Sequence, residues 1–271
     1  MDAKSTMTMN LADTVIQAAK DMAKRVLPPR AQARVRDILP QPAMQLVPTE
    51  ELERVYRRAV AYLREGTGYS VGDYLEFGVY RGDSLLCMDR IRRELGMSFR
   101  LFGFDSFEGL PALEAGDEGL GWAAGWFRWN YKRTQKRLEQ AGLDRKNAVL
   151  VKGWYKETLT PELVRRYNLV KASTIMIDCD LYSSTRTALE FCAPLIKDEA
   201  IVFFDDWDGG SGLADRGMGE AHAFAEFLQL HPEFASEEFD IYYHTEMDRP
   251  ALAKVFRISR LGADEARVAT P

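Results

Sequence analysis

Cysteine and histidine are scarce in this chain of 271 residues, which has three of each. Cys87, Cys179 and Cys192 are too few and too widely spaced for a disulfide scaffold, so we expect free thiols in a reducing cytoplasm. The histidines form no HExxH motif and no pair with the spacing of zinc ligands. His222 lies in a helical pattern and is expected to be a packing or surface residue rather than a catalyst.

The sequence also lacks an excess of positive charge and a long apolar run. Its 36 Lys and Arg residues against 41 Asp and Glu give a net charge of -5, which argues against a nucleic-acid partner. No apolar stretch approaches the roughly 20 residues of a membrane helix, and residues 1–17 are too polar for a secretory signal. With 46% hydrophobic residues, the composition is that of a globular protein, which we expect to be cytoplasmic and not to bind membranes.

Two helical patterns precede residue 70. Apolar residues recur at helical spacing over 11–26, and Pro28–Pro29 ends that pattern. A basic amphipathic helix can bind a membrane surface, but this stripe is short and has no aromatic anchor. We therefore expect an arm that packs on its own domain or joins the subunits of a homo-oligomer. A second helix is predicted from the N-cap Thr49 to Gly66. Its apolar stripe consists of Leu52, Val55, Tyr56, Ala59, Val60 and Leu63.

From residue 72, short apolar runs alternate with helical patterns, which predicts a mostly parallel sheet covered on both faces. The expected strands are 73–79, 99–105, 148–153, 174–180 and 200–206. The expected helices are 84–95, 130–142, 161–168, 184–196 and 219–230. Two further strands, 239–245 and 251–259, follow each other directly and predict an antiparallel C-terminal hairpin, for seven strands in all.

The turn after the first strand has the spacing ExGxxxGxS over 76–84, not GxGxxG. Glycines there let a ligand approach the backbone, and the helix start offers free N–H groups. This spacing favours a ligand with a carboxylate over a dinucleotide pyrophosphate, and Ser84 is a candidate donor to that carboxylate. A tight turn without a ligand is the alternative.

The second and third strands add two features of a nucleoside site. Asp105 ends the second strand 27 residues after Gly78 (105 minus 78), where an acidic side chain can bind a ribose diol. The third strand leads into Gly153–Trp154, where side chains would flank a base. A turn or N-cap role for Asp105 and a core position for Trp154 are the alternatives.

Four aspartates follow the fourth and fifth strands. Asp178 and Asp180 share one side if the strand continues through them, whereas Asp205 and Asp206 converge only if the chain turns there. Roles in helix caps and loop turns are the alternative for one or two of the four. Gathering these carboxylates without a counter-charge costs several kcal/mol, so a divalent cation or protonation must compensate. Oxygen ligands favour Mg²⁺, with Mn²⁺ or Ca²⁺ as substitutes.

Five motifs together resemble the macrocin O-methyltransferase (TylF-like) family: EFGVYRGDS, GFDSFEGLP, KGWYKETL, IDCDLYSST and FFDDW. The resemblance covers about residues 72 to 258. It implies a Rossmann-like class I methyltransferase fold in the α/β class. It also implies an S-adenosylmethionine- and Mg²⁺-dependent enzyme that methylates sugar hydroxyls of natural products.

The same resemblance implies roles for particular residues. Gly78 to Ser84 would bind the methionine end of the cofactor, Asp105 and Ser106 its ribose, and the Gly153–Trp154 turn its adenine. Asp178, Asp205 and Asp206 would hold Mg²⁺, and Asp180 would be the general base. The implied cofactor-binding set is Glu76, Gly78, Val79, Tyr80, Gly82, Ser84, Asp105, Ser106, Gly153, Trp154 and Asp178.

The predicted organisation is a helical arm over 1–70, a methyltransferase domain over 71–260 and a flexible tail over 261–271. The glycine- and tryptophan-rich stretch 107–129 suits a mobile lid over a sugar or aglycone, or a surface loop. A phenol or catechol methyltransferase and a non-methylating nucleoside-binding relative are the functional alternatives to a sugar O-methyltransferase.

Overall fold

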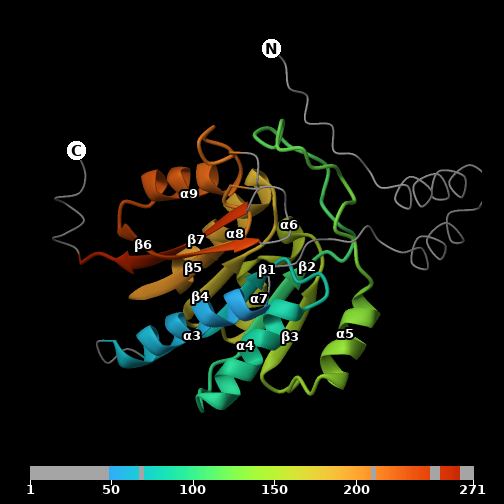
Figure 1. Cartoon of the computed structure of the whole chain (residues 1–271), viewed down its shortest axis with the longest axis vertical. Coiled ribbons are helices and arrows are strands. Elements are labelled where there is room, and N and C mark those ends of the chain that lie inside the picture. Colours follow the sequence, from blue (N-terminus) through green and yellow to red (C-terminus); the bar gives the residue numbers. More distant parts are fainter. Residues whose placement is uncertain (1–48, 67–69, 209–211, 245–250, 263–271) are drawn as a thin grey trace, which may run out of the picture. The chain divides into compact units, whose positions relative to one another are not determined.

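The computed structural model describes residues 49–66, 70–208, 212–244 and 251–262, which form a seven-stranded sheet with helices on both faces (Figure 1). The strand order is β3-β2-β1-β4-β5-β7-β6. Strands β1 to β5 pair in parallel, whereas β7 pairs antiparallel with both β5 and β6. The strands are β1 (Asp73–Phe77), β2 (Leu101–Asp105), β3 (Ala148–Lys152), β4 (Ala172–Ile177), β5 (Glu199–Phe204), β6 (Phe234–His244) and β7 (Ala251–Arg260). The predicted sheet and C-terminal hairpin are confirmed.

The central strands are mostly apolar because both faces of the sheet are covered. Every residue of β1, β4 and β5 is buried. Side chains alternate between two apolar clusters, so that Tyr74 lies in one and Leu75 in the other.

Each cluster is closed by its own helices. On the first face, called the α3 face, lie α3 (Thr49–Glu65), α4 (Asp83–Glu94) and α5 (Tyr131–Gln140). On the opposite face lie α7 (Pro161–Tyr167), α8 (Tyr182–Cys192) and α9 (Gly219–Leu230). A four-residue helix, α6 (Tyr155–Thr158), and the 3₁₀ helix η1 (Ala193–Leu195) complete the set among the described residues.

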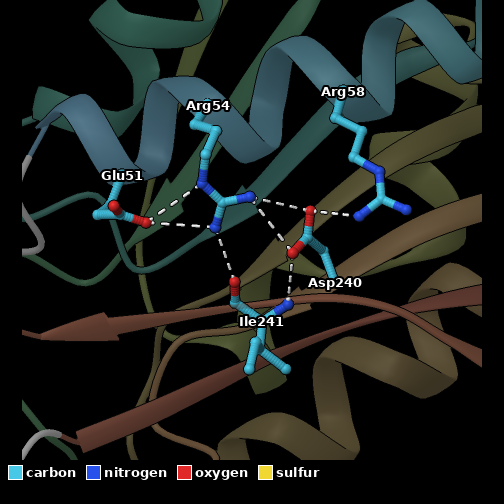
Figure 2. Close-up of polar contacts among 5 residues, drawn as sticks. All are labelled: Glu51, Arg54, Arg58, Asp240 and Ile241. Carbon is cyan, nitrogen blue, oxygen red and sulfur yellow. Dashed lines mark hydrogen bonds and ion pairs between the residues drawn. The ribbon is translucent and has the colours of Figure 1, made fainter.

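Helix α3 is confirmed as predicted, because all six residues of its apolar stripe are buried in the core of the α3 face. Its polar side meets β6 (Figure 2). Arg54 and Arg58 both pair with the carboxylate of Asp240, at 3.2 and 2.7 Å, and Arg54 also donates to the carbonyl oxygen of Ile241 at 2.9 Å. This helix is therefore joined to the last hairpin by both apolar and charged contacts.

Several other expectations concern the ends of the chain. Residues 46–271 form one compact unit that includes α3. The arm predicted over 11–26 lies outside the described residues, as does most of the tail, and the predicted boundary near residue 70 stays a prediction. All three cysteines are free and buried, as expected. No helix in the described part of the chain is long and apolar enough to cross a membrane.

Candidate active site

The predicted site residues follow β1, β2, β3, β4 and β5, whose carboxyl ends meet at one edge of the sheet. Three non-glycine residues just beyond these strands have a positive φ: Tyr80 (46°), Phe107 (55°) and Asp180 (61°). Such conformations cost energy and persist where the surrounding structure enforces them, which is typical of functional sites.

Gly78 brings the β1 turn against the end of β4. Its φ is 96°, and a Cβ atom there would lie 1.6 Å from the carbonyl oxygen of Asp178. Only glycine permits this approach. Gly82, with a φ of 80°, is the residue before α4 and ends the same turn. The two glycines therefore shape the turn itself, and the predicted contact with a cofactor builds on that shape.

Glu76 is completely buried beneath this turn. It accepts hydrogen bonds from the Tyr74 hydroxyl at 2.6 Å and the Ser84 hydroxyl at 2.8 Å. Burial raises the pKa of Glu76 to about 8, although both hydrogen bonds oppose the shift. In this structure Ser84 donates to Glu76, and its donation to a ligand carboxylate stays a prediction.

Asp105 joins the turns after β1 and β2. Its carboxylate accepts from the backbone N–H groups of Val79 at 2.9 Å, Tyr80 at 2.8 Å and Phe107 at 2.6 Å. Burial raises the pKa of Asp105, and these three bonds lower it in part. The structure thus assigns Asp105 the turn-forming role that the sequence left open, while its contact with a ribose stays a prediction.

The other predicted cofactor residues lie next to Asp105. The Ser106 hydroxyl donates to the carbonyl oxygen of Gly109 at 3.0 Å and so shapes the turn after β2. The Gly153 N–H donates to the carbonyl oxygen of Asp105 at 3.0 Å, which brings the half-buried Trp154 to the same edge. The ribose and adenine residues implied by the sequence are therefore neighbours in space.

The four predicted aspartates gather at the ends of β4 and β5. The chain turns directly after Phe204, as convergence of Asp205 and Asp206 required. Burial raises the pKa of Asp178, and the charges of Asp205 and Asp206 raise it further. The pKa of Asp180 is raised by burial and by the same two neighbours. Cys179 points away into the core, near the Thr185 hydroxyl at 3.6 Å.

Sequence reasoning missed two side chains that hold this cluster. The Tyr242 hydroxyl donates to Oδ1 of Asp205 at 2.6 Å. Glu220, in the first turn of α9, accepts from the backbone N–H of Asp206 at 3.0 Å. Burial and the charges of Asp206 and Asp205 raise the pKa of Glu220. An acidic residue at a helix start was a weak signal for Glu220, whereas nothing in the sequence marked Tyr242.

The donors of this cluster suit a hard divalent cation, since all are carboxylate oxygens and Oε1 of Glu220 is buried without a hydrogen-bond partner. Their arrangement is not that of a finished site. In the described part of the chain, no group of three or more His, Cys, Asp or Glu side chains is placed to hold a metal ion. Asp180 and Asp206 share a hydrogen bond, which requires a proton on one of the two carboxyl groups. The predicted metal ligands stay a prediction.

The segment 107–129 is fastened beside the aspartates. Asp117 is buried and accepts from the backbone N–H of Ser183 at 3.0 Å and from its hydroxyl at 2.7 Å, at the start of α8. Leu110 and Leu120 of this segment form a small apolar cluster with Leu181 and Leu213, against which Trp122 packs. The segment is thus folded onto the site, and its predicted motion as a lid stays a prediction.

Comparison with known proteins gives one family match and one curated relative. A family model described as macrocin O-methyltransferase (TylF) matches residues 2–230. A protein of Streptomyces olivaceus, named 8-demethyl-8-(2,3-dimethoxy-alpha-L-rhamnosyl)-tetracenomycin-C 4'-O-methyltransferase, is 29% identical over 143 residues, which are 50% of this chain and 53% of the relative. The match therefore spans about half the length of that curated relative.

Solved structures share the fold. The O-methyltransferase NovP superimposes with a TM-score of 0.60 and 20% identity, over 78% of this chain and 80% of NovP. The O-methyltransferase TomG from Streptomyces achromogenes, solved in complex with SAM, gives a TM-score of 0.53 and 13% identity, over 94% of this chain and 100% of TomG. The expected Rossmann-like methyltransferase fold is confirmed.

Proposed function

Because this chain belongs to the macrocin O-methyltransferase (TylF) family, we propose that it transfers a methyl group from S-adenosylmethionine to a hydroxyl group of a sugar or glycosylated small molecule. The observation that carries the proposal is the meeting of the glycine turn, Asp105 and four aspartates at one edge of the sheet. A nucleoside site and an acidic acceptor site then lie side by side, as methyl transfer requires.

S-adenosylmethionine, when bound, supplies a methyl group on a positively charged sulfur. The turn from Gly78 to Ser84 would bind its methionine part, Asp105 and Ser106 its ribose, and Gly153 and Trp154 its adenine. These roles rest on the family and on the proximity of the residues. The existing bonds from Val79 and Tyr80 to Asp105 support them, because they hold the turn in place before a ligand arrives.

Asp178, Asp205 and Asp206 would hold Mg²⁺, for which Mn²⁺ can substitute. The cation would orient the acceptor hydroxyl and lower the pKa of that hydroxyl. The donor chemistry supports this part of the proposal, as does the repulsion by which the charges of Asp205 and Asp206 raise the pKa of Asp178.

Asp180 would take the proton. As the acceptor oxygen forms a bond to the methyl carbon and the bond from that carbon to sulfur breaks, a carboxylate oxygen of Asp180 accepts the hydroxyl proton. S-adenosylhomocysteine and the methyl ether are the products. Burial and the nearby charges of Asp206 and Asp205 raise the pKa of Asp180, which supports its position beside the other aspartates.

The acceptor is proposed to be a sugar hydroxyl because the relative from Streptomyces olivaceus is named for methylation of a rhamnosyl group. Self-association through residues 11–26 and a cytoplasmic location are proposed on the sequence alone.

Calorimetry with S-adenosylhomocysteine, followed by methylation assays on rhamnosides and catechols with and without EDTA, tests the proposal. We expect cofactor binding in EDTA, turnover only with Mg²⁺, and activity on rhamnosides. Preference for catechols would move the enzyme to the phenol class. Failure to bind either S-adenosylmethionine or S-adenosylhomocysteine would contradict a methyltransferase.

A further inference from the structure

Three tyrosines lie fully buried on the α3 face of the sheet. They are Tyr56 of α3, Tyr74 of β1 and Tyr242 of β6, and each is 0% exposed. A buried hydroxyl costs free energy unless it is hydrogen-bonded, so its hydrogen-bond partner indicates its structural role. Here two of the three hydroxyls contact carboxylates of the candidate site.

The first contact leads to the cofactor turn. Tyr74 and Glu76 share a face of the sheet because they are two residues apart in β1, and the Tyr74 hydroxyl donates to Oε2 of Glu76 at 2.6 Å. The Tyr56 hydroxyl lies 2.8 Å from that of Tyr74. This hydrogen bond between the two hydroxyls holds Tyr74 in place beside Glu76. Ser84 holds the other oxygen of Glu76.

The second contact leads to the aspartates. Asp205 directly follows β5, and β7 lies between β5 and β6 in the sheet. Two strand spacings amount to about 10 Å, so the Tyr242 side chain passes over β7 to reach Asp205. Its hydroxyl donates to Oδ1 of Asp205 at 2.6 Å. The edge strand β6 thereby holds the Asp205 carboxylate at the end of β5, although β5 and β6 are not paired.

Two of these three segments, α3 with Tyr56 and β6 with Tyr242, are joined to each other (Figure 2). Arg54 and Arg58 stand two residues before and after Tyr56, and both pair with Asp240, which precedes Tyr242 by two residues. The contacts of Arg54 extend to the carbonyl oxygen of Ile241. The helix and the strand are thus held in register at the positions of their buried tyrosines.

We propose that Tyr74 and Tyr242 are positioning residues for separate halves of the site, Tyr74 for the cofactor turn through Glu76 and Tyr242 for the acidic cluster through Asp205. The proposal rests on the proposed function. It makes α3 and β6, which lie outside the five parallel strands, part of the methyltransferase site, with Tyr56 supporting Tyr74.

Removal of single hydroxyls from the full-length protein tests the proposal. The variants are Tyr74→Phe and Tyr242→Phe, with Tyr62→Phe as the matched control. Tyr62 also lies on α3, and its hydroxyl is bonded to Glu199 at 3.1 Å and to Arg257 at 3.0 Å, outside the candidate site. The measurements are S-adenosylhomocysteine affinity by calorimetry, Mn²⁺ affinity by electron paramagnetic resonance, and melting temperature.

We expect Tyr74→Phe to weaken S-adenosylhomocysteine binding about tenfold and to change Mn²⁺ binding less than about twofold. Tyr242→Phe should show the reverse pattern. Tyr62→Phe should lower the melting temperature without changing either affinity. If Tyr74→Phe does not fold, Tyr56→Phe should give the same pattern as Tyr74→Phe with a smaller loss.

The proposal is overturned if neither affinity changes, or if both fall together in proportion to the melting temperature. Wild-type protein that binds S-adenosylhomocysteine but not Mn²⁺ overturns the role given to Tyr242. Wild-type protein that does not bind S-adenosylhomocysteine contradicts the proposed function itself, and is thereby distinguished from failure of the tyrosine assignment alone.

Discussion

The two halves of the candidate site, the cofactor turn and the acidic cluster, stabilise their carboxylates in different ways. At the ends of β1 and β2, Glu76 and Asp105 accept hydrogen bonds from hydroxyl and backbone N–H groups of the chain. At the ends of β4 and β5, burial raises the pKa of Asp178 and Asp180, and the charges of Asp205 and Asp206 raise it further. In the second half, Asp205 and Glu220 also accept hydrogen bonds from the chain, but the carboxylates repel one another, and a cation would relieve that repulsion. We therefore expect the cofactor turn to have its final arrangement before the cofactor binds, and the acidic cluster to reach its own only when a cation binds.

The largest expected effect breaks the contact between the two halves. Gly78→Ala would place a methyl group 1.6 Å from the Asp178 carbonyl oxygen, so we expect a loss of more than about 4 kcal/mol in the free energy of unfolding. Gly96→Ala is the control, since Gly96 also has a positive φ (64°) but no heavy atom lies within 4 Å of the added carbon. It should cost about 1 kcal/mol. Equal costs in chemical denaturation would contradict the close approach.

The second prediction concerns pH and the turn. Because the pKa of Glu76 is raised from 4.5 to about 8, its stabilising contribution is fully present below pH 4.5 and is lost as the pH rises through 8. The wild type should lose on the order of 3 to 5 kcal/mol more than Glu76→Gln over this interval. Denaturation curves of both proteins without ligand provide the measurement. If the free energy of unfolding has the same pH dependence in the wild type and in Glu76→Gln, the raised pKa of Glu76 is contradicted.

The third prediction distinguishes the general base of the acidic half, Asp180, from a metal ligand, Asp205. Asp180→Asn should lower kcat about 10²-fold or more while Mg²⁺ and S-adenosylhomocysteine affinities stay within about twofold. Asp205→Ala should instead abolish Mg²⁺ binding together with activity. Unchanged turnover of Asp180→Asn would remove Asp180 from the role of base, and an active, EDTA-insensitive Asp205→Ala would contradict the metal ligands.

The smallest expected effect tests whether the segment 107–129 belongs with the acidic half of the site. Asp117→Asn removes one acceptor from Ser183 and should cost about 1 kcal/mol of stability. It should also raise KM for the acceptor without changing cofactor affinity. Glu118→Gln is the control: this exposed neighbour accepts from the backbone N–H of Gly116 at 2.8 Å, which a glutamine oxygen can also do, and it should change neither quantity. A parallel loss of cofactor affinity in Asp117→Asn would place the segment with the other half.

Much of this architecture could be predicted because the patterns that specify it are local. Helix α9 has the bounds 219–230 predicted from its apolar spacing, and the stripe of α3 is buried as expected. Strand β6 begins at Phe234 rather than at 239, because the polar run at 236–238 on an edge strand hid the pattern. The four-residue α6 was missed because it is too short to show a helical period.

The aspartates could be found in advance because parallel strands end at the same edge of a sheet. Their partners could not. The contact of Tyr242 with Asp205 depends on β7 lying between β5 and β6, and no local pattern reveals that order. The contact of Tyr56 with Tyr74 likewise depends on the side of the sheet on which α3 packs.

The position of β7 between β5 and β6 has a consequence for folding during synthesis. Among the strands of the described sheet, β7 is synthesised last, so β5 has an unpaired edge until about residue 260 has left the ribosomal exit tunnel. Tyr242 can reach Asp205 only once that insertion has taken place. The nascent chain is therefore expected to complete its cofactor turn early and its acidic half last.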